Sequence, residues 1–191
     1  GRHNWIVSFD LNSLYPHLIM QYNISPETIL GTWEDEIGVD GLVNKEFDTS
    51  IWKEKNVTVT PNGSVYRKDK QGFLPKLMEN MYNDRVKYKK LMLTEQKKGR
   101  NADPNKLSQY YNYQQNLKIA LNSAYGAMGN QWFRFYDERN AEAVSVAGQL
   151  SVQWAENAVN GYLNTTLGTV NVDYIVAMDT DSLYVCLDSL V

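Results

Sequence analysis

The sequence has little of what disulfide frameworks, zinc sites or membrane spans require. It contains one cysteine, Cys186, which excludes an internal disulfide and agrees with a reducing intracellular setting. Its two histidines, His3 and His17, are too few for a zinc site built from cysteine and histidine. No apolar run approaches the roughly 20 residues of a membrane-spanning helix, so no membrane partner is expected.

The composition supports a folded core and shows an uneven charge. Hydrophobic residues make up 43% of the 191 residues, enough for the core of one domain or of two small lobes. The net charge is −3, yet residues 67–118 hold 13 Lys and Arg against 5 Asp and Glu. A basic middle between acidic ends suits a phosphate-binding surface beside carboxylate chemistry, and it suits a solvated helix face equally well.

The first elements are predicted from a short apolar run and a proline. Residues 5–9 predict a buried strand that ends at Asp10. Pro16 suits the first turn of a short helix that extends to Tyr22. Residues 24–27 then break this helix.

Residues 32–71 are polar and are predicted to be largely irregular. Strand-like runs at residues 57–60 and 64–66 flank Asn62 and Gly63, which is a strong hairpin signal. We interpret this region as an accessory insertion.

Two long helices are predicted next. The first covers residues 74–98, and a turn at residues 99–104 follows it. The second runs from residue 105 to residue 125 and ends at Gly126. Because the link is short, the helices are expected to form an antiparallel pair, and the basic residues concentrate on it.

The last part of the chain predicts a helix and a β-hairpin. The helix covers residues 140–163, with a buried stripe of Ala143, Ala147, Leu150, Trp154 and Ala158. Apolar strands at residues 174–178 and 183–187 flank Asp-Thr-Asp-Ser at residues 179–182, which places acids at the hairpin tip. The expected fold class is therefore α/β (α+β), an antiparallel sheet backed by helices with a helical hairpin.

Three carboxylates stand at predicted strand ends: Asp10, Asp179 and Asp181. Asp179 and Asp181 are two residues apart, so in extended backbone they would share a face. Such a cluster is costly without a cation because like charges repel, and two Mg²⁺ ions held by carboxylates are suited to phosphoryl transfer. An isolated Asp-Thr-Asp is nonetheless more typical of an ordinary turn.

Cationic and amide side chains recur at helical spacing. Arg85 and Lys89 are four residues apart on the first long helix, and Lys118 and Asn122 repeat that spacing on the second. Facing each other across a hairpin, the four side chains could clamp a triphosphate. Each one taken singly is more typical of a solvated surface.

A turn is expected at Ser-Leu-Tyr-Pro, residues 13–16, just after Asp10. It would offer backbone N–H groups to anionic oxygens. Tyr15 could pack beneath a sugar ring and leave no room for a 2′-hydroxyl, although a tyrosine before a proline is more commonly a core residue.

The motifs and their order resemble the family B DNA polymerases. Asp-Leu-Asn-Ser-Leu-Tyr-Pro at residues 10–16 is similar to the family's first polymerase motif, Lys-Ile-Ala-Leu-Asn-Ser-Ala-Tyr-Gly at residues 118–126 to its second, and Asp-Thr-Asp-Ser at residues 179–182 to its third. The resemblance covers nearly the whole chain. Residues 23–28 and 129–134 are similar to the T-even bacteriophage replicative polymerases in particular.

The resemblance implies a role for each matching residue. The catalytic carboxylates would be Asp10, Asp179 and Asp181. The ligands of two Mg²⁺ ions, or of Mn²⁺ in their place, would be Asp10, Asp181 and the Leu11 carbonyl. The site for the incoming triphosphate would comprise Ser13, Leu14, Tyr15, Arg85, Lys89, Lys118 and Asn122. Tyr125 and Gly126 would support the nascent base pair and sense its minor groove.

The resemblance also implies a division of the chain. Residues 1–71 would form the first part of a palm, including the insertion at about 32–71. Residues 72–122 would form a fingers hairpin, and residues 123–191 the truncated second part of the palm. Neither a thumb nor an exonuclease domain is recognisable, so we expect a fragment of a longer polymerase that binds DNA weakly alone. Met178 stands where the family usually has glycine.

The implied reaction is template-directed DNA synthesis, in which a primer 3′-hydroxyl attacks a deoxynucleoside triphosphate and pyrophosphate leaves. The expected substrates are primer–template DNA and deoxynucleoside triphosphates. The expected protein partners are the missing polymerase domains, a sliding clamp or a partner chain. The expected location is the cytoplasm of a bacterial host. Two alternatives stay open: a non-catalytic nucleic-acid-binding module that uses the basic hairpin, and a polymerase piece that works only with a partner chain. A reverse transcriptase is disfavoured because its third motif has adjacent aspartates.

Overall fold

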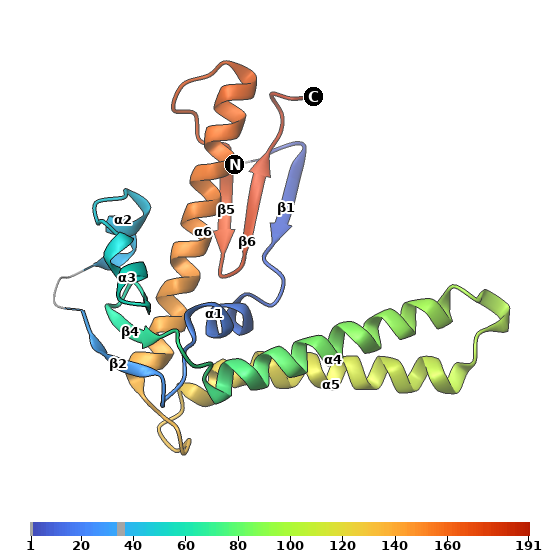
Figure 1. The fold of residues 1–191 in the computed structure, drawn as a ribbon. Coiled ribbons are helices and arrows are strands. Elements are labelled where there is room, and N and C mark those ends of the chain that lie inside the picture. Colours follow the sequence, from blue (N-terminus) through green and yellow to red (C-terminus); the bar gives the residue numbers. More distant parts are fainter. Residues whose placement is uncertain (1, 34–36) are drawn as a thin grey trace.

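A computed structural model describes residues 2–33 and 37–191 of the chain. It contains two antiparallel three-stranded sheets and a long helical hairpin (Figure 1). The first sheet has the spatial order β1 (Ile6–Asp10), β6 (Ser182–Cys186) and β5 (Ile175–Asp179). The predicted fold class, an antiparallel sheet backed by helices with a helical hairpin, is confirmed.

The first sheet lies against α6 (Glu138–Leu167), which contacts β5 and β6. Leu163, Tyr174 and Val185 form the buried cluster between the helix and the sheet. β1 is the edge strand on the side of the sheet away from α6 (Figure 1), and all five of its residues are exposed. The strand predicted here is present, but its predicted burial is wrong because no described element covers it as α6 covers β5 and β6.

α6 buries a different stripe from the one predicted. Ala143 and Ala147 are fully buried as expected, whereas Leu150 is only half-buried, Ala158 is exposed and Trp154 is 65% exposed. The buried residues of the helix are Asn140, Ala143, Val144, Ala147, Gly148, Val152 and Leu163. The prediction of one continuous buried stripe is wrong because the two halves of α6 bury different faces of the helix. The first half packs into the helical core, and the second half packs against the first sheet.

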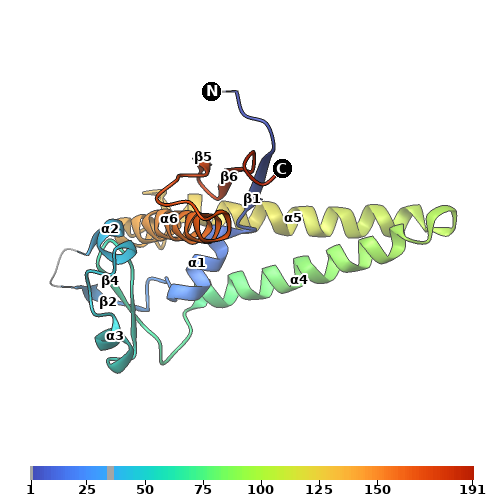
Figure 2. The ribbon, with the colours of Figure 1, turned by 90° about the horizontal axis from the view of Figure 1, so that it is seen from above.

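The second sheet has the order β2 (Ile29–Thr32), β4 (Ser64–Arg67) and β3 (Val57–Val59). The hairpin predicted around Asn62 and Gly63 is confirmed, since β3 and β4 pair in antiparallel fashion and Gly63 has a φ of 79°. Figures 1 and 2 place the two sheets on opposite sides of α6.

The region predicted to be an irregular insertion is more regular than expected. Besides these strands, it contains α2 (Gly38–Val43) and α3 (Ser50–Glu54). Ile37, Val59 and Val65 form a small buried cluster of its own. The prediction of irregular structure is therefore wrong, and residues 34–36 of the predicted insertion lie outside the described residues.

A buried hydrogen bond ties the second sheet to α6. The Tyr66 hydroxyl on β4 donates to Asn140 Oδ1 at 2.8 Å, and the two residues are 0% and 1% exposed. Burial also raises the pKa of Tyr66, so the phenol stays neutral and can donate at ordinary pH. Because both groups are removed from water, breaking the bond leaves an unsatisfied oxygen inside the core.

We expect Tyr66→Phe to destabilise the protein by about 1–3 kcal/mol, the usual cost of leaving a buried acceptor without its donor. Urea unfolding followed by circular dichroism measures this change. Tyr162→Phe is the matched control, because Tyr162 is 71% exposed and its hydroxyl can bond to water. An equal free energy of unfolding for both variants would contradict the assignment of a stabilising bond.

The helical hairpin consists of α4 (Phe73–Gln96) and α5 (Pro104–Met128), which lie side by side and project away from both sheets (Figures 1 and 2). Its turn includes the short helix η1 (Gly99–Asn101). Glu95, which is 6% exposed, accepts hydrogen bonds from the Asp103 amide and Lys98 Nζ, and these bonds lower the pKa of Glu95. Asp103 then caps α5.

The antiparallel hairpin predicted from sequence is thus confirmed, with one difference at its end. α5 does not end at Gly126 but continues to Met128. Met128 is 2% exposed and belongs to the main core, so its burial favours the extra helical residues over a break at glycine.

The main core joins α1 (Leu14–Tyr22) to α4, α5 and α6. Its buried members are Ile19, Ile24, Tyr66, Leu74, Met78, Leu121, Met128, Ala143 and Val144. Asn23, in the left-handed conformation with φ 60°, ends α1 as its C-cap. Its Oδ1 accepts a hydrogen bond from the Gly72 amide at 2.8 Å. A Cβ at Gly72 would stand 2.6 Å from Ser25 Cβ, so this close contact requires glycine and fixes the start of α4.

Candidate active site

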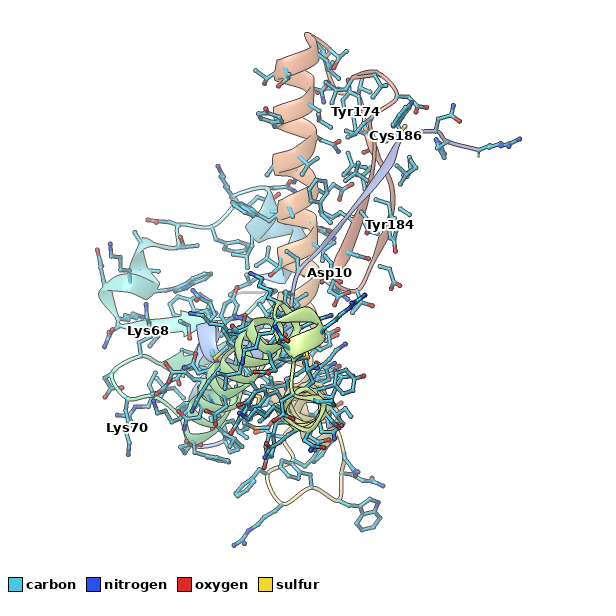
Figure 3. All side chains as sticks on the ribbon, turned by 90° about the vertical axis from the view of Figure 1, so that its right-hand side faces the viewer. Asp10, Lys68, Lys70, Tyr174, Tyr184 and Cys186 are labelled. Carbon is cyan, nitrogen blue, oxygen red and sulfur yellow. The ribbon has the colours of Figure 1, made fainter. Side chains whose placement is uncertain are left out.

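A cavity of about 410 Å³ lies where the first sheet meets the helical hairpin. Its lining comes from the end of β1, the start of α1, both hairpin helices and the β5–β6 turn: Asp10, Asn12, Ser13, Leu14, Tyr15, Pro16, Arg85, Lys118, Asn122, Thr180 and Asp181. Figure 3 shows Asp10 at the end of the sheet near the hairpin, with Tyr174 and Cys186 at the opposite end. Segments far apart in the sequence therefore form one site.

Two of the three predicted carboxylates reach this cavity. Asp10 pairs with Ser182 in the β1–β6 register, and the Leu11 amide donates to the Asp181 carbonyl at 2.7 Å, which holds Asp181 beside the end of β1. Asp10 and Asp181 line the cavity, whereas Asp179 does not.

The exclusion of Asp179 follows from the turn between β5 and β6. Thr180 has a φ of 39°, so the backbone is not extended between Asp179 and Asp181. The argument that these two aspartates share a face because they are two residues apart is therefore wrong. A tight turn replaces strand alternation at this point.

The two carboxylates at the cavity fit a magnesium ion. Mg²⁺ in nucleotide sites is commonly bound by one or two carboxylates and completes its shell with phosphate oxygens and water. Across residues 2–33 and 37–191, no group of three or more His, Cys, Asp or Glu could hold a metal by itself. Asp10 and Asp181 thus suit an ion that arrives with phosphates. The Leu11 carbonyl stays a predicted ligand, and Leu11 lines a different cavity.

Two cations and an amide of the hairpin line the same cavity as these carboxylates. Arg85 on α4 and Lys118 and Asn122 on α5 line the cavity. Arg85 Nη1 donates to Ser13 Oγ at 3.0 Å, which joins the hairpin to the start of α1. Arg85 Nε is buried and has no hydrogen-bond partner among the described residues. The cavity therefore combines anionic and cationic walls, as a bound metal–polyphosphate would require.

Lys89, the fourth predicted member of the clamp, is not at this cavity. It lines a neighbouring cavity along α4, which the first cavity touches through Asn12 and Arg85. Lys89 shares a helix face with Arg85, but this does not bring it to the first cavity. Each turn of α4 carries the next side chain on that face about 5.4 Å farther along the helix axis.

The start of α1 lies at the cavity. Ser13 adopts a left-handed conformation, with φ 56° and ψ 44°, and is the N-cap of the helix. The first N–H groups of a helix have no partner within it and carry partial positive charge. Ser13, Leu14 and Tyr15 line the cavity, and their binding of phosphate oxygens stays a prediction.

The ring of Tyr15 is held from two sides. Its centroid lies 4.6 Å from that of Tyr125, and a Cβ at Gly148 on α6 would stand 3.0 Å from Tyr15 Cε1. Burial, with smaller contributions from Tyr125 and Asp181, raises the pKa of Tyr15, so the phenol stays neutral beside anionic groups. Tyr125 thus supports a cavity residue but does not line the cavity itself. Gly126 is exposed and also lies outside the lining.

Three residues at the site were missed by sequence reasoning. Asn12 and Thr180 line the cavity from inside two recognised motifs, but no pattern singles them out. Gly148 has a usable signal, because a glycine inside a long helix is unfavourable and commonly marks a close approach.

We expect Gly148→Ala to displace the Tyr15 ring and weaken deoxynucleotide binding at least about threefold, while stability changes by less than about 1 kcal/mol because alanine favours the helix. The matched control is Gly161→Ala in the same helix, where an added Cβ would meet no atom within 4 Å. The control should be more stable by about 0.5–1 kcal/mol and keep its affinity for deoxynucleotide. Fluorescence titration measures the deoxynucleotide affinity of both variants, and thermal unfolding measures their stability. Equal affinities in the two variants would contradict the role of Gly148.

The site thus joins the acid-bearing end of an antiparallel sheet to a basic helical hairpin. The model of the DNA polymerase family B matches residues 3–190. The DNA-directed DNA polymerase of Escherichia phage RB69 is 33% identical over 238 residues, covering 100% of this chain and 26% of that protein. That of Enterobacteria phage T4 is 34% identical over 232 residues, covering 98% and 25%. DNA polymerase 1 of Pyrococcus abyssi is 32% identical over 180 residues, covering 94% and 19%.

The chain therefore belongs to the DNA polymerase family B. It spans about a quarter of the length of the two phage relatives. Among the described residues, no helix is both long and apolar enough to cross a membrane.

Proposed function

We propose that this chain supplies the nucleotide-binding and catalytic centre of a DNA-directed DNA polymerase. The observation that carries the proposal is the cavity in which Asp10 and Asp181 face Arg85 and Lys118, in a chain that belongs to family B. The substrates would be primer–template DNA and deoxynucleoside triphosphates. As for a phage replicative enzyme, the setting would be the cytoplasm of a bacterial host, together with the remaining polymerase domains and a sliding clamp.

The division into palm and fingers follows from the same proposal. Residues 1–71 and 123–191 would be the palm, and residues 72–122 the fingers hairpin. The Arg85–Ser13 hydrogen bond and the anchoring of Gly72 would keep the fingers aligned on the palm. The long projection of α4 and α5 suits a lever whose tilt changes how deeply Arg85 and Lys118 enter the cavity.

Each residue has a part in the proposed reaction. Asp10 and Asp181 would hold Mg²⁺, which when bound neutralises phosphate charge and lowers the pKa of the primer hydroxyl. Arg85 and Lys118 would bind the triphosphate oxygens and stabilise the negative charge that develops as pyrophosphate leaves. The amides at the start of α1 would orient the same phosphates. Tyr15 would lie against the deoxyribose.

Primer extension tests this proposal. The purified chain is incubated with primer–template DNA, Mg²⁺ and the four deoxynucleoside triphosphates, and the primer is resolved on a sequencing gel. Extension that follows the template is the expected result. DNA binding without incorporation, and without metal-dependent binding of nucleotide, would contradict it and favour a nucleic-acid-binding module that uses the basic hairpin. Incorporation only after another polymerase segment is added would identify a piece that depends on a partner chain.

A further inference from the structure

His17, in the first turn of α1, makes a side-chain contact with the residue that begins the helix. Its Nδ1 lies 2.9 Å from the carbonyl oxygen of Ser13, and its backbone amide donates to the same oxygen at 3.2 Å. Because a carbonyl oxygen can only accept, Nδ1 carries the proton in this contact. Two groups of the half-buried His17 therefore hold the carbonyl of Ser13.

This side-chain bond supports an uncommon backbone conformation. The φ of 56° and ψ of 44° at Ser13 lie in the left-handed region, which residues other than glycine seldom adopt without support from their surroundings. An N-cap serine commonly accepts a hydrogen bond from its own helix, but the hydroxyl of Ser13 makes no such bond. It accepts instead from Arg85 Nη1 at 3.0 Å. His17 thus stabilises the conformation in which Ser13 reaches Arg85.

His17 also contacts the helix that carries Arg85. Its ring lies edge-on against the ring of Tyr82, with centroids 4.5 Å apart and an angle of 79° between the planes. Tyr82 precedes Arg85 by three residues on α4, so the two side chains are neighbours on the helix surface. α1 packs against α4 (Figure 1). His17 therefore joins the two elements between which the Arg85–Ser13 hydrogen bond is formed.

Arg85 has few other contacts to fix its position. Among the described residues, the bond to Ser13 is the one hydrogen bond of its guanidinium, and Arg85 forms no ion pair with any of them. Its Nε is buried without an acceptor there. Fixing a long arginine side chain costs conformational entropy, so its position depends on the contacts that hold it. An arginine already held at the cavity can offer its remaining donors to a phosphate.

We propose that His17 is a positioning residue for nucleotide binding, which acts through Ser13 and Tyr82 to hold Arg85 at the catalytic cavity. The proposal rests on the function proposed above for that cavity. His17 does not line the cavity, so it would contact neither the nucleotide nor a metal ion. Its effect on binding should therefore disappear when Arg85 is removed, whereas a general contribution to the fold would persist.

The test is isothermal titration of the purified chain with dATP and Mg²⁺. His17→Phe keeps a ring beside Tyr82 but loses the Nδ1 donor, and it should weaken dATP binding about fivefold, within the range expected for one hydrogen bond. His17→Asn can place an amide donor where Nδ1 lies and should lose less than about threefold. His17→Ala loses both contacts and should lose about tenfold. His3→Ala, at an exposed position, is the matched control and should stay within about twofold.

Thermal unfolding checks that every variant is folded at the temperature of the titration. The order of affinities then distinguishes the role of the donor from a loss of packing. Rescue by His17→Asn relative to His17→Ala supports the proposal. Unchanged affinity in both His17→Phe and His17→Ala would overturn it.

The same substitution in an Arg85→Ala background tests whether His17 acts through Arg85. Arg85→Ala alone should weaken dATP binding, and adding His17→Phe should then change the affinity by less than about twofold. A fivefold loss from His17→Phe in both backgrounds would overturn the proposal. If Arg85→Ala leaves the affinity unchanged, the proposed triphosphate site fails, and the role of His17 fails with it. If Arg85→Ala weakens binding while no substitution of His17 does, the site stands and only the role of His17 falls.

Discussion

Asp181→Asn is expected to lower the rate of primer extension by at least about 10³-fold. The substitution removes one of the two carboxylates at the cavity, and the bound metal's stabilisation of transition-state charge is worth several kcal/mol. The fold should be retained, because the contact that holds residue 181 is made by its backbone carbonyl with the Leu11 amide. Timed extension assays and circular dichroism measure the two effects.

Two other aspartates make the prediction specific. Asp188 is exposed beyond the other end of β6, and Asp188→Asn should leave the rate within about twofold of the original, as surface changes usually do. Asp179 does not line the cavity, so Asp179→Asn should cost clearly less than Asp181→Asn. Full activity in Asp181→Asn, or an equal loss in all three variants, would refute the catalytic assignment.

The second large effect is expected in the choice of sugar. Tyr15 lines the cavity and is fixed between Tyr125 and Gly148, so its ring has little room to move aside. A 2′-hydroxyl would meet this ring, and we expect the protein to prefer dATP over ATP by about 100-fold. Tyr15→Ala opens the space and should reduce the preference to less than about fivefold.

Competition titrations with dATP and ATP in the presence of Mg²⁺ measure the preference without any requirement for DNA. Tyr15→Phe keeps the ring and should keep the preference, which separates the ring's bulk from its hydroxyl. An unchanged ratio in Tyr15→Ala would show that another group excludes the 2′-hydroxyl. A lost preference in Tyr15→Phe would mean that the hydroxyl, not the ring, is responsible.

Those residues of the cavity that lie at strand ends, in turns or at helical spacing could be predicted from the sequence. Asp10 follows an apolar run, Asp181 lies in a hairpin tip, and Lys118 and Asn122 are one helical turn apart. Sequence patterns of this kind mark the ends and faces of elements. Since strand ends and helix faces meet at the cavity, these residues were found from the sequence.

The positions that could not be predicted depend on how elements pack together. Lys89 shares a helical spacing with Arg85, but the direction in which α4 leaves the sheet decides which turn reaches the cavity. Trp154 and β1 are apolar yet exposed, because burial depends on which element covers them. For Asp179, the turn at residues 179–182 was predicted, but the left-handed conformation of Thr180 within it, which removes the shared extended face of Asp179 and Asp181, was not.

The most direct test of the account is whether dATP binding depends on both metal and Asp181. Isothermal titration compares the unaltered chain and Asp181→Asn, each with Mg²⁺ and with a chelator. The account predicts that dATP binds to the unaltered chain with Mg²⁺ and that affinity falls at least about tenfold in the variant or with the chelator. Equal affinity in all four titrations would contradict the claim that Asp10 and Asp181 form a metal-dependent nucleotide site.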